Sequence, residues 1–98
     1  MLYYILRKLI LELPEISRFL GISITMYFKD HAPPHFHAEY NEFEATFDIN
    51  TLSKINGDLP SRVLGFVVEW AALHQKELLD NWESLNKVGS FTKIAPLV

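Results

Sequence analysis

The chain has 98 residues, of which 49% are hydrophobic and 21% are charged, and its formal net charge is −3. These values are typical of one globular domain with a thin core. The acidic balance argues against a surface that coats nucleic acid, because phosphate binding needs clustered lysine and arginine. The sequence contains no cysteine, which excludes disulfides and thiolate chemistry and is compatible with the cytoplasm, where we expect the protein.

Residues 1–13 form a conspicuously apolar segment. The segment is too short to span a bilayer, and it lacks the small-residue cleavage site of a signal peptide. Pro14 is expected to end it. We interpret residues 1–13 as an N-terminal extension that packs on the domain, on a second copy or on a partner, while residues 14–98 form a single α+β domain. Attachment to a membrane surface and an upstream start codon are the alternatives.

Several segments after Pro14 alternate between polar and apolar residues, a period of two that is typical of β-strands. Asn41-Glu42 fits a two-residue hairpin turn, because asparagine adopts positive φ at low cost. Residues 56–58 are expected to form another turn. The predicted strands cover residues 22–29, 35–40 and 43–48, with a shorter one at 51–55.

The period changes after Pro60. Apolar residues then recur at three- and four-residue steps as far as Leu85, which indicates one amphipathic helix or two helices in line. Ser61 or Asp58 would cap its start, and Gly89 lies just past its end. Residues 91–94 are expected to add a short strand. The pattern predicts an α+β fold, in which an antiparallel meander of three to five strands packs on one long amphipathic helix, whole or broken.

Residues 30–39 hold three of the four histidines and two carboxylates, a density that packing alone seldom requires. A hairpin with Asn41-Glu42 at its turn places the histidines of this segment on one surface, and a slip of one residue would send them into the core. The opposite, apolar face should contact the helix. The predicted facing pairs on the polar surface are Glu39 with Glu44, His37 with Thr46, and His35 with Asp48.

Three interpretations of this surface stay open. His35 and His37 could bind a divalent metal such as zinc together with Glu39 or Asp48, because His-x-His on a strand puts both imidazoles on one side. The same histidines could instead perform acid–base catalysis without a metal, with Asp48 orienting His35. The third interpretation is structural, with His31 capping the loop and the strand histidines lying in a half-buried sheet.

Other side chains near this surface are candidate binding residues. Glu39 and Glu44 face each other as like charges, which costs stability unless a cation lies between them or one pKa is raised. Tyr27 and His31 complete the candidate set. His74 lies on the apolar stripe of the predicted helix and is interpreted as a core histidine.

Between Pro14 and Leu97 the chain resembles a family of small bacterial proteins known as domain of unknown function 4160. Members usually begin near the position of Pro14, so residues 1–13 are a departure. The resemblance implies a gene that often lies beside one for domain of unknown function 2442, in pairs similar to toxin–antitoxin modules, and it brings no established catalytic residues. The matching residues include Pro14–Phe19, Asp30-His31, the run Pro33–Tyr40, Glu69-Trp70 and Asn81-Trp82.

We therefore expect first a small interaction protein, one component of a toxin–antitoxin-like pair. It would bind a protein partner or a second copy of itself through its N-terminal segment. The alternatives are a nuclease, metal-assisted or metal-independent, that uses His35, His37 and Asp48, and a metal-binding regulator. RNA is also considered as a partner, although the acidic charge of the chain argues against it. Whether the protein is an enzyme stays open.

Overall fold

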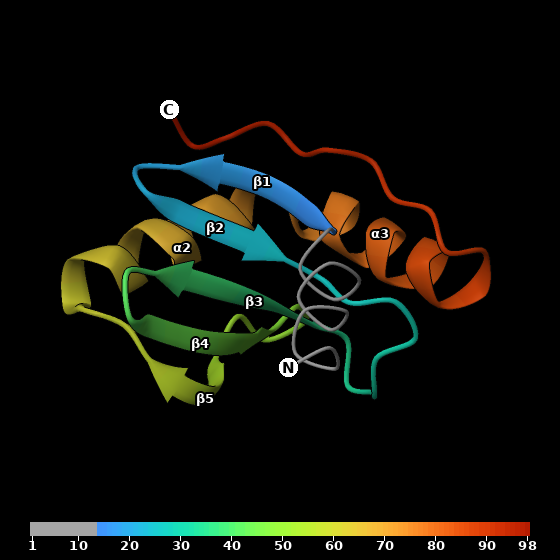
Figure 1. Cartoon of the computed structure of the whole chain (residues 1–98), viewed down its shortest axis with the longest axis horizontal. Coiled ribbons are helices and arrows are strands. Elements are labelled where there is room, and N and C mark those ends of the chain that lie inside the picture. The colour runs from blue at the N-terminus through green and yellow to red at the C-terminus, as the bar shows by residue number, and fades with distance from the viewer. Residues whose placement is uncertain (1–13) are drawn as a thin grey trace, which may run out of the picture.

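The computed structural model describes residues 14–98, which form a five-stranded antiparallel sheet and two helices (Figure 1). Each strand pairs with the next one along the chain, so the predicted meander and the α+β class are confirmed. The predicted N-terminal extension, residues 1–13, lies outside the described residues. The elements are β1 (Glu15–Phe19), β2 (Ile22–Thr25), β3 (His35–Tyr40), β4 (Phe43–Asp48), β5 (Lys54–Asp58), α2 (Ser61–Leu73) and α3 (Gln75–Lys87).

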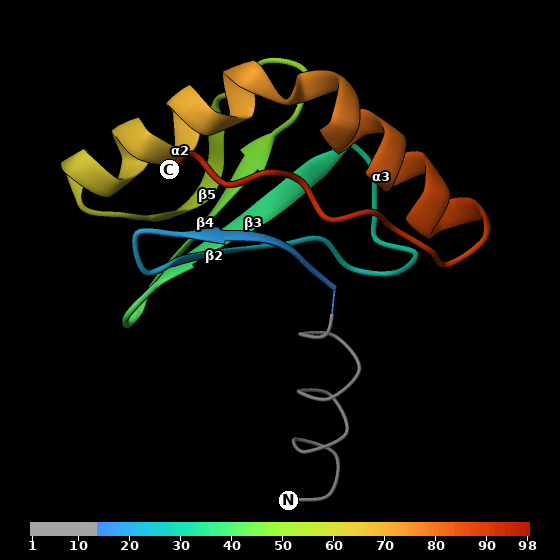
Figure 2. The same ribbon diagram turned by 90° about the horizontal axis from the view of Figure 1, so that it is seen from above.

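Both helices lie on the same face of the sheet (Figure 2), and the core fills the space between the helices and the sheet. Phe36 of β3 and Phe47 of β4 occupy facing positions, and their rings stack with centroids 5.4 Å apart. Trp70 of α2 is fully buried and meets Phe36 edge-on at 6.0 Å. Its indole N–H donates a hydrogen bond to the carbonyl oxygen of Ala95 at 2.8 Å, which holds the C-terminal tail against the core.

The ends of the sheet differ from the prediction. β1 is not predicted, because its five residues follow the apolar N-terminal segment without a clear alternation. The strand predicted over residues 22–29 ends at Thr25, and Lys29 has a φ of 54°. The predicted strand over residues 91–94 is wrong. That stretch makes a single ladder-like contact, in which the N–H of Ile94 donates to the carbonyl oxygen of Ile16 at 2.8 Å.

β5 includes the residues predicted as a turn. Gly57 has a φ of 77°, and a Cβ added there would lie 2.1 Å from the carbonyl oxygen of Glu44. The missing side chain therefore lets β5 approach β4 closely, and the turn residue becomes part of an irregular edge strand. A register shift between Thr46 and Phe47 marks the same irregularity.

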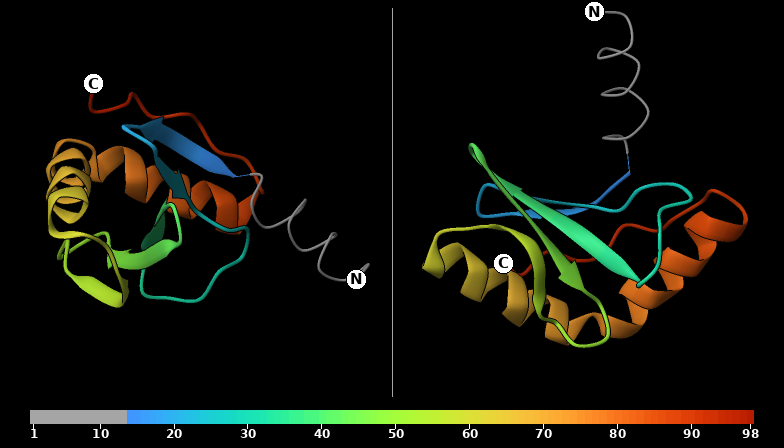
Figure 3. Two further views of the ribbon diagram at one scale, coloured as in Figure 1. Left: turned by 60° about the vertical axis from the view of Figure 1, so that its left-hand side comes forward. Right: turned by 90° about the horizontal axis from the view of Figure 1, so that it is seen from below.

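The single long helix is wrong, and the alternative of two helices holds. His74 separates α2 from α3 with a φ of −128° and a ψ of 24°, and the helical path changes direction there (Figure 3). Its side chain packs against Trp70 with ring centroids 5.4 Å apart. The apolar stripe continues across the break. The start of α2 has Pro60 at the N-cap, not Ser61 or Asp58.

The end of α3 follows the prediction. Gly89 has a φ of 75°, and its N–H donates to the carbonyl oxygen of Ser84 at 3.0 Å, an arrangement typical of helix C-termini. Within residues 14–98, neither helix has the length and apolar character needed to cross a membrane.

Candidate functional site

The hairpin of β3 and β4 has the predicted register. Asn41 adopts a φ of 53° in the two-residue turn, and the three facing pairs on the polar surface follow from that turn. Because the side-chain period is two, both strand histidines point away from the core contacts of Phe36. The observed pairs are Glu39 with Glu44, His37 with Thr46, and His35 with Asp48.

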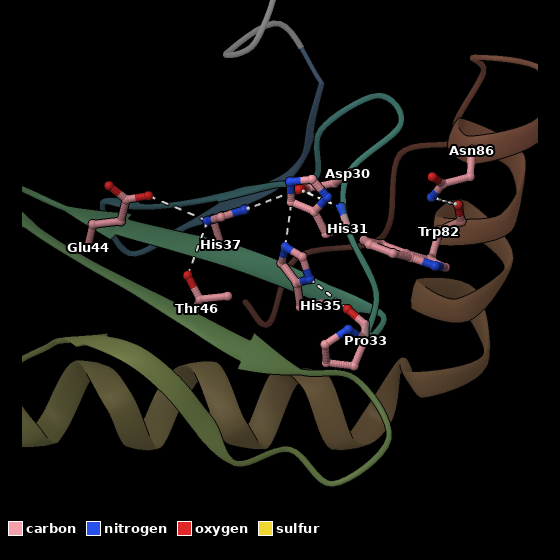
Figure 4. A network of polar contacts seen from close by, with 9 residues as sticks. All are labelled: Asp30, His31, Pro33, His35, His37, Glu44, Thr46, Trp82 and Asn86. Carbon is pink, nitrogen blue, oxygen red and sulfur yellow. Dashed lines mark hydrogen bonds and ion pairs between the residues drawn. The ribbon is translucent and has the colours of Figure 1, made fainter.

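The loop of residues 26–34 folds back over this surface and places Asp30 between the two histidines (Figure 4). Oδ2 of Asp30 lies 3.0 Å from Nε2 of His35 and 3.5 Å from Nε2 of His37. The end of the loop is held by Pro34, whose carbonyl oxygen accepts the N–H of Ile49 at 3.0 Å. The carboxylate that contacts both histidines is therefore Asp30.

The ring of His35 has a defined orientation. Its Nδ1 lies 2.7 Å from the carbonyl oxygen of Pro33, and a carbonyl can only accept, so Nδ1 carries the hydrogen. In the neutral ring, Nε2 then presents a lone pair to the carboxylate of Asp30. Two lone pairs facing each other at 3.0 Å require a cation between them, either a proton or a metal ion.

Contacts at Nδ1 and at the face of the ring orient His37. Its Nδ1 lies 3.3 Å from Oγ1 of Thr46 and 3.5 Å from Oε2 of Glu44, and its ring stacks on Tyr27 with centroids 4.5 Å apart. Nε2 of His37 is buried and has no hydrogen-bond partner among residues 14–98. The Asp30 oxygen at 3.5 Å is within ion-pair distance but too far for a good hydrogen bond.

The surroundings favour the neutral form of the His37 imidazole and the ionised form of the Asp30 carboxylate. Burial lowers the pKa of His37 below its usual value, although the carboxylate of Asp30 opposes this shift, so the neutral ring is favoured. Burial acts to raise the pKa of Asp30, but the backbone N–H of His31 and, when its ring is protonated, the charge of His35 outweigh it and leave the pKa below its usual value. A neutral imidazole and an ionised carboxylate are the forms that bind metal ions.

The three side chains are shielded from solvent but open on one side. Those of Asp30, His35 and His37 are 18%, 11% and 14% exposed. The ring of Trp82 in α3 packs beside the ring of His35, with centroids 5.0 Å apart, and covers that side of the three side chains (Figure 4). All three side chains line a pocket, which Tyr27 also lines.

The other predicted site residues lie in different surroundings. Asp48 faces His35 in register, but its Oδ1 accepts the N–H groups of Asn50 and Thr51 at 2.7 and 3.0 Å and so caps the turn after β4. His31 is exposed, and its backbone N–H donates to Oδ1 of Asp30 at 2.8 Å.

Among the described residues, one group of three potential metal ligands has its ligand atoms within 4.8 Å of one another, and it consists of Asp30, His35 and His37. Glu39 is not part of this group. Asp30 was not among the predicted ligands, although it belongs to the same ten-residue stretch as the histidines. Its proximity in sequence was the available signal.

Comparison with known proteins places this region within a described family. The family model for "Domain of unknown function (DUF4160)" matches residues 21–83, a range that contains the loop, the hairpin and Trp82. No curated protein and no solved structure matches the chain.

Proposed function

The chain belongs to the DUF4160 family, whose description assigns no activity, and we propose from the site itself that the protein binds a divalent transition-metal ion such as zinc. The ligands are Asp30, His35 and His37. One observation supports this proposal above the others. The three ligand atoms face one another, while the second polar atom of each side chain is engaged by a different group.

The separations between the ligand atoms fit a metal centre. Bonds of about 2.0–2.1 Å place neighbouring ligands about 3.3 Å apart in a tetrahedron and about 2.9 Å apart at a right angle. The Asp30 oxygen lies 3.0 Å from the nitrogen of His35 and 3.5 Å from that of His37. The two histidine nitrogens lie within 4.8 Å of each other, so they need to approach no closer than about 3.3 Å to share one tetrahedral ion with Asp30.

The surrounding contacts also match those of metal ligands. A ligating histidine usually donates its other ring N–H to a carbonyl or a carboxylate, which fixes the ring. His35 does so with the carbonyl oxygen of Pro33, and Nδ1 of His37 faces Glu44 and Thr46. These contacts orient both Nε2 atoms toward Asp30 before any ion binds.

The ligand set indicates the class of ion and of chemistry. Two imidazoles and one carboxylate suit zinc, iron, nickel or copper better than magnesium or calcium. Three protein ligands leave at least one coordination position for water or another molecule, which is typical of catalytic rather than structural zinc sites. The metal-binding regulator and the metal-assisted nuclease are both forms of this proposal.

Titration calorimetry with zinc, on protein purified without an affinity tag, tests the proposal. We expect one zinc ion per chain. Replacing a residue that only hydrogen-bonds a metal ligand typically lowers metal affinity by about 10–100-fold. Removing a ligand itself should therefore weaken zinc binding by at least about 100-fold in Asp30→Ala, His35→Ala and His37→Ala. His31→Ala and Glu39→Gln are the matched controls, because they change neighbouring residues outside the ligand group. Unchanged affinity in the three ligand variants, or no binding by the wild type, would overturn the proposal.

A second candidate function is that of an interaction component in a toxin–antitoxin-like pair. The observation that favours a protein partner is β5, whose residues are all exposed and which, within the described residues, pairs only with β4. Exposed edge strands pair readily with strands of other chains. Co-expression with the neighbouring gene product tests this proposal. Ile55→Pro should abolish co-purification if β5 is the contact, and a monomeric chain that captures no neighbour would contradict it.

A further inference from the structure

A pocket of about 500 Å³ opens over the proposed metal ligands. Its size falls within the range of small-molecule sites. The loop between β2 and β3 forms one side, and β3, β4 and β5 form the floor and the other side. The lining residues are 27–33, His35, His37, Thr46, Ile55 and Asn56.

We propose that this pocket binds a small molecule that carries an oxyanion, either carboxylate or phosphate, on an apolar body. The oxyanion would occupy the open coordination position of the metal ion and approach the ammonium group of Lys29. This inference rests on the proposed metal site, and it adds the class of ligand that the site accepts.

The charges of the lining residues support an anionic ligand. With histidines counted as neutral, Lys29 contributes +1 and Asp30 contributes −1, and these are the formal charges among the described lining residues. A bound divalent ion adds +2, so the occupied pocket carries a net charge of +2. Because a shielded charge is costly without a counter-charge, an anion is the favoured ligand at the open position.

The apolar part of the pocket supports an organic ligand rather than a free inorganic anion. Phe28 and Ile55, from opposite sides of the pocket, are 47% and 50% exposed. Exposed apolar side chains that gather at a concave surface are typical of ligand-binding sites. Nζ of Lys29 lies 5.5 Å from the centre of the Phe28 ring, so the cation and the apolar surface are adjacent.

The same charges argue against a nucleic-acid strand as the ligand. A polyphosphate chain is bound by clustered cations, whereas the lining contains one lysine among the described residues. The net charge of the chain, −3, opposes a long polyanion as well. A single oxyanion needs only the metal ion and Lys29.

The experiment uses the full chain loaded with cobalt(II), whose visible absorption reports changes in its ligands. Phenyl phosphate, benzoate and inorganic phosphate are the probes, and benzyl alcohol is the neutral comparison. We expect the two aromatic anions to change the spectrum at lower concentration than inorganic phosphate, and benzyl alcohol to leave it unchanged. The stronger of the two aromatic anions then identifies phosphate or carboxylate as the natural group.

Two variants test the assigned residues. Lys29→Asn removes the cation and keeps a residue that tolerates the φ of 54° found there, so we expect about fivefold weaker binding of phenyl phosphate at unchanged cobalt affinity. Ile55→Ser should weaken phenyl phosphate but not inorganic phosphate. Lys76→Gln is the control, because this exposed lysine on α3 pairs with Asp80 away from the pocket.

The outcomes separate the two proposals. If cobalt binds but none of the anions changes its spectrum, the oxyanion inference is overturned while the metal site stands. If the protein binds no metal, both are overturned. Titration calorimetry supplies the two comparisons that the cobalt spectrum cannot report. A short RNA strand that binds more tightly than phenyl phosphate would overturn the assignment to small molecules, and equal binding of phenyl phosphate by metal-free protein would overturn the role of the metal ion.

Discussion

Replacing Asp30 by asparagine would separate metal binding from the stability of the fold. Oδ1 of Asp30 accepts the backbone N–H of His31 at 2.8 Å, and Oδ2 lies 3.0 Å from Nε2 of His35. Asparagine keeps the first acceptor and supplies an amide N–H that can donate to the lone pair of His35. We therefore expect Asp30→Asn to change the free energy of unfolding of the metal-free protein by less than about 1 kcal/mol.

The effect on the metal-bound protein should be much larger. An ion at a free concentration 100 times its Kd stabilises the wild type by about 2.7 kcal/mol. In a domain of this size 1 kcal/mol corresponds to about 4–8 °C in Tm, so zinc should raise the Tm by about 10–20 °C. If Asp30→Asn binds zinc about 100-fold more weakly, the gain at the same concentration falls to about 0.4 kcal/mol, or about 2–3 °C.

Thermal unfolding followed by circular dichroism at pH 7, with EDTA and then with zinc, measures both quantities. His31→Ala is the control and should keep the full zinc-induced increase. Equal increases in the wild type and in Asp30→Asn would refute the assignment of Asp30 as a ligand. A decrease of more than about 8 °C in EDTA would show that the carboxylate stabilises the fold itself, and would favour the structural interpretation of the two histidines.

Three further predictions concern the scaffold of the site. Trp70→Ala removes a fully buried ring and should lower the free energy of unfolding by about 3–5 kcal/mol in urea titrations, and a loss below about 1 kcal/mol would contradict its place in the core. Gly57→Ala puts a Cβ against the carbonyl oxygen of Glu44, so we expect the free energy of unfolding to fall by about 1–3 kcal/mol and amide exchange in β5 to become faster. Unchanged amide exchange would argue against the close approach of β5 to β4. Burial acts to raise the pKa of Glu15, but the hydrogen bond from Ser23 helps to bring the pKa below the usual value of 4.5. The ionised carboxylate therefore stabilises the folded protein above pH 4.5, and this contribution is lost as the pH falls through the folded pKa. Glu15→Gln should therefore be less stable than the wild type at pH 7, and the difference should shrink at pH 3; a difference independent of pH would contradict this prediction.

Local rules predict the hairpin that carries the two histidines. The alternation of residues 35–40 and 43–48 sets the faces of both strands, and Asn41 accepts the positive φ that a two-residue turn needs. Both signals lie within fourteen consecutive residues, and a slip of one residue would expose Phe36 and Phe47. The strand at residues 54–58 shows the limit of such rules, because Gly57 is typical of a turn and only its close contact with β4 makes it part of an edge strand.

The break between the helices shows the same limit. The stripe of apolar residues runs unchanged through residues 60–85, so the sequence pattern allows one helix or two. Packing decides between them, because the path bends at His74, whose ring lies against Trp70. Nearby, the side chain of Gln75 donates to the carbonyl oxygen of Ile49 at 2.8 Å and connects the start of α3 to the loop after β4.

The amino-acid sequence by itself determined the α+β class, the hairpin register and the surface that His35 and His37 share, because each depends on residue periods and a turn that act over short distances. Only the tertiary structure decided which carboxylate meets them. Asp48 faces His35 in the ladder, yet its carboxylate accepts hydrogen bonds from the turn that follows β4. Asp30 instead lies in a loop whose end is held by the hydrogen bond between Pro34 and Ile49. The path of that loop depends on contacts between residues distant in the chain, and no local pattern encodes it.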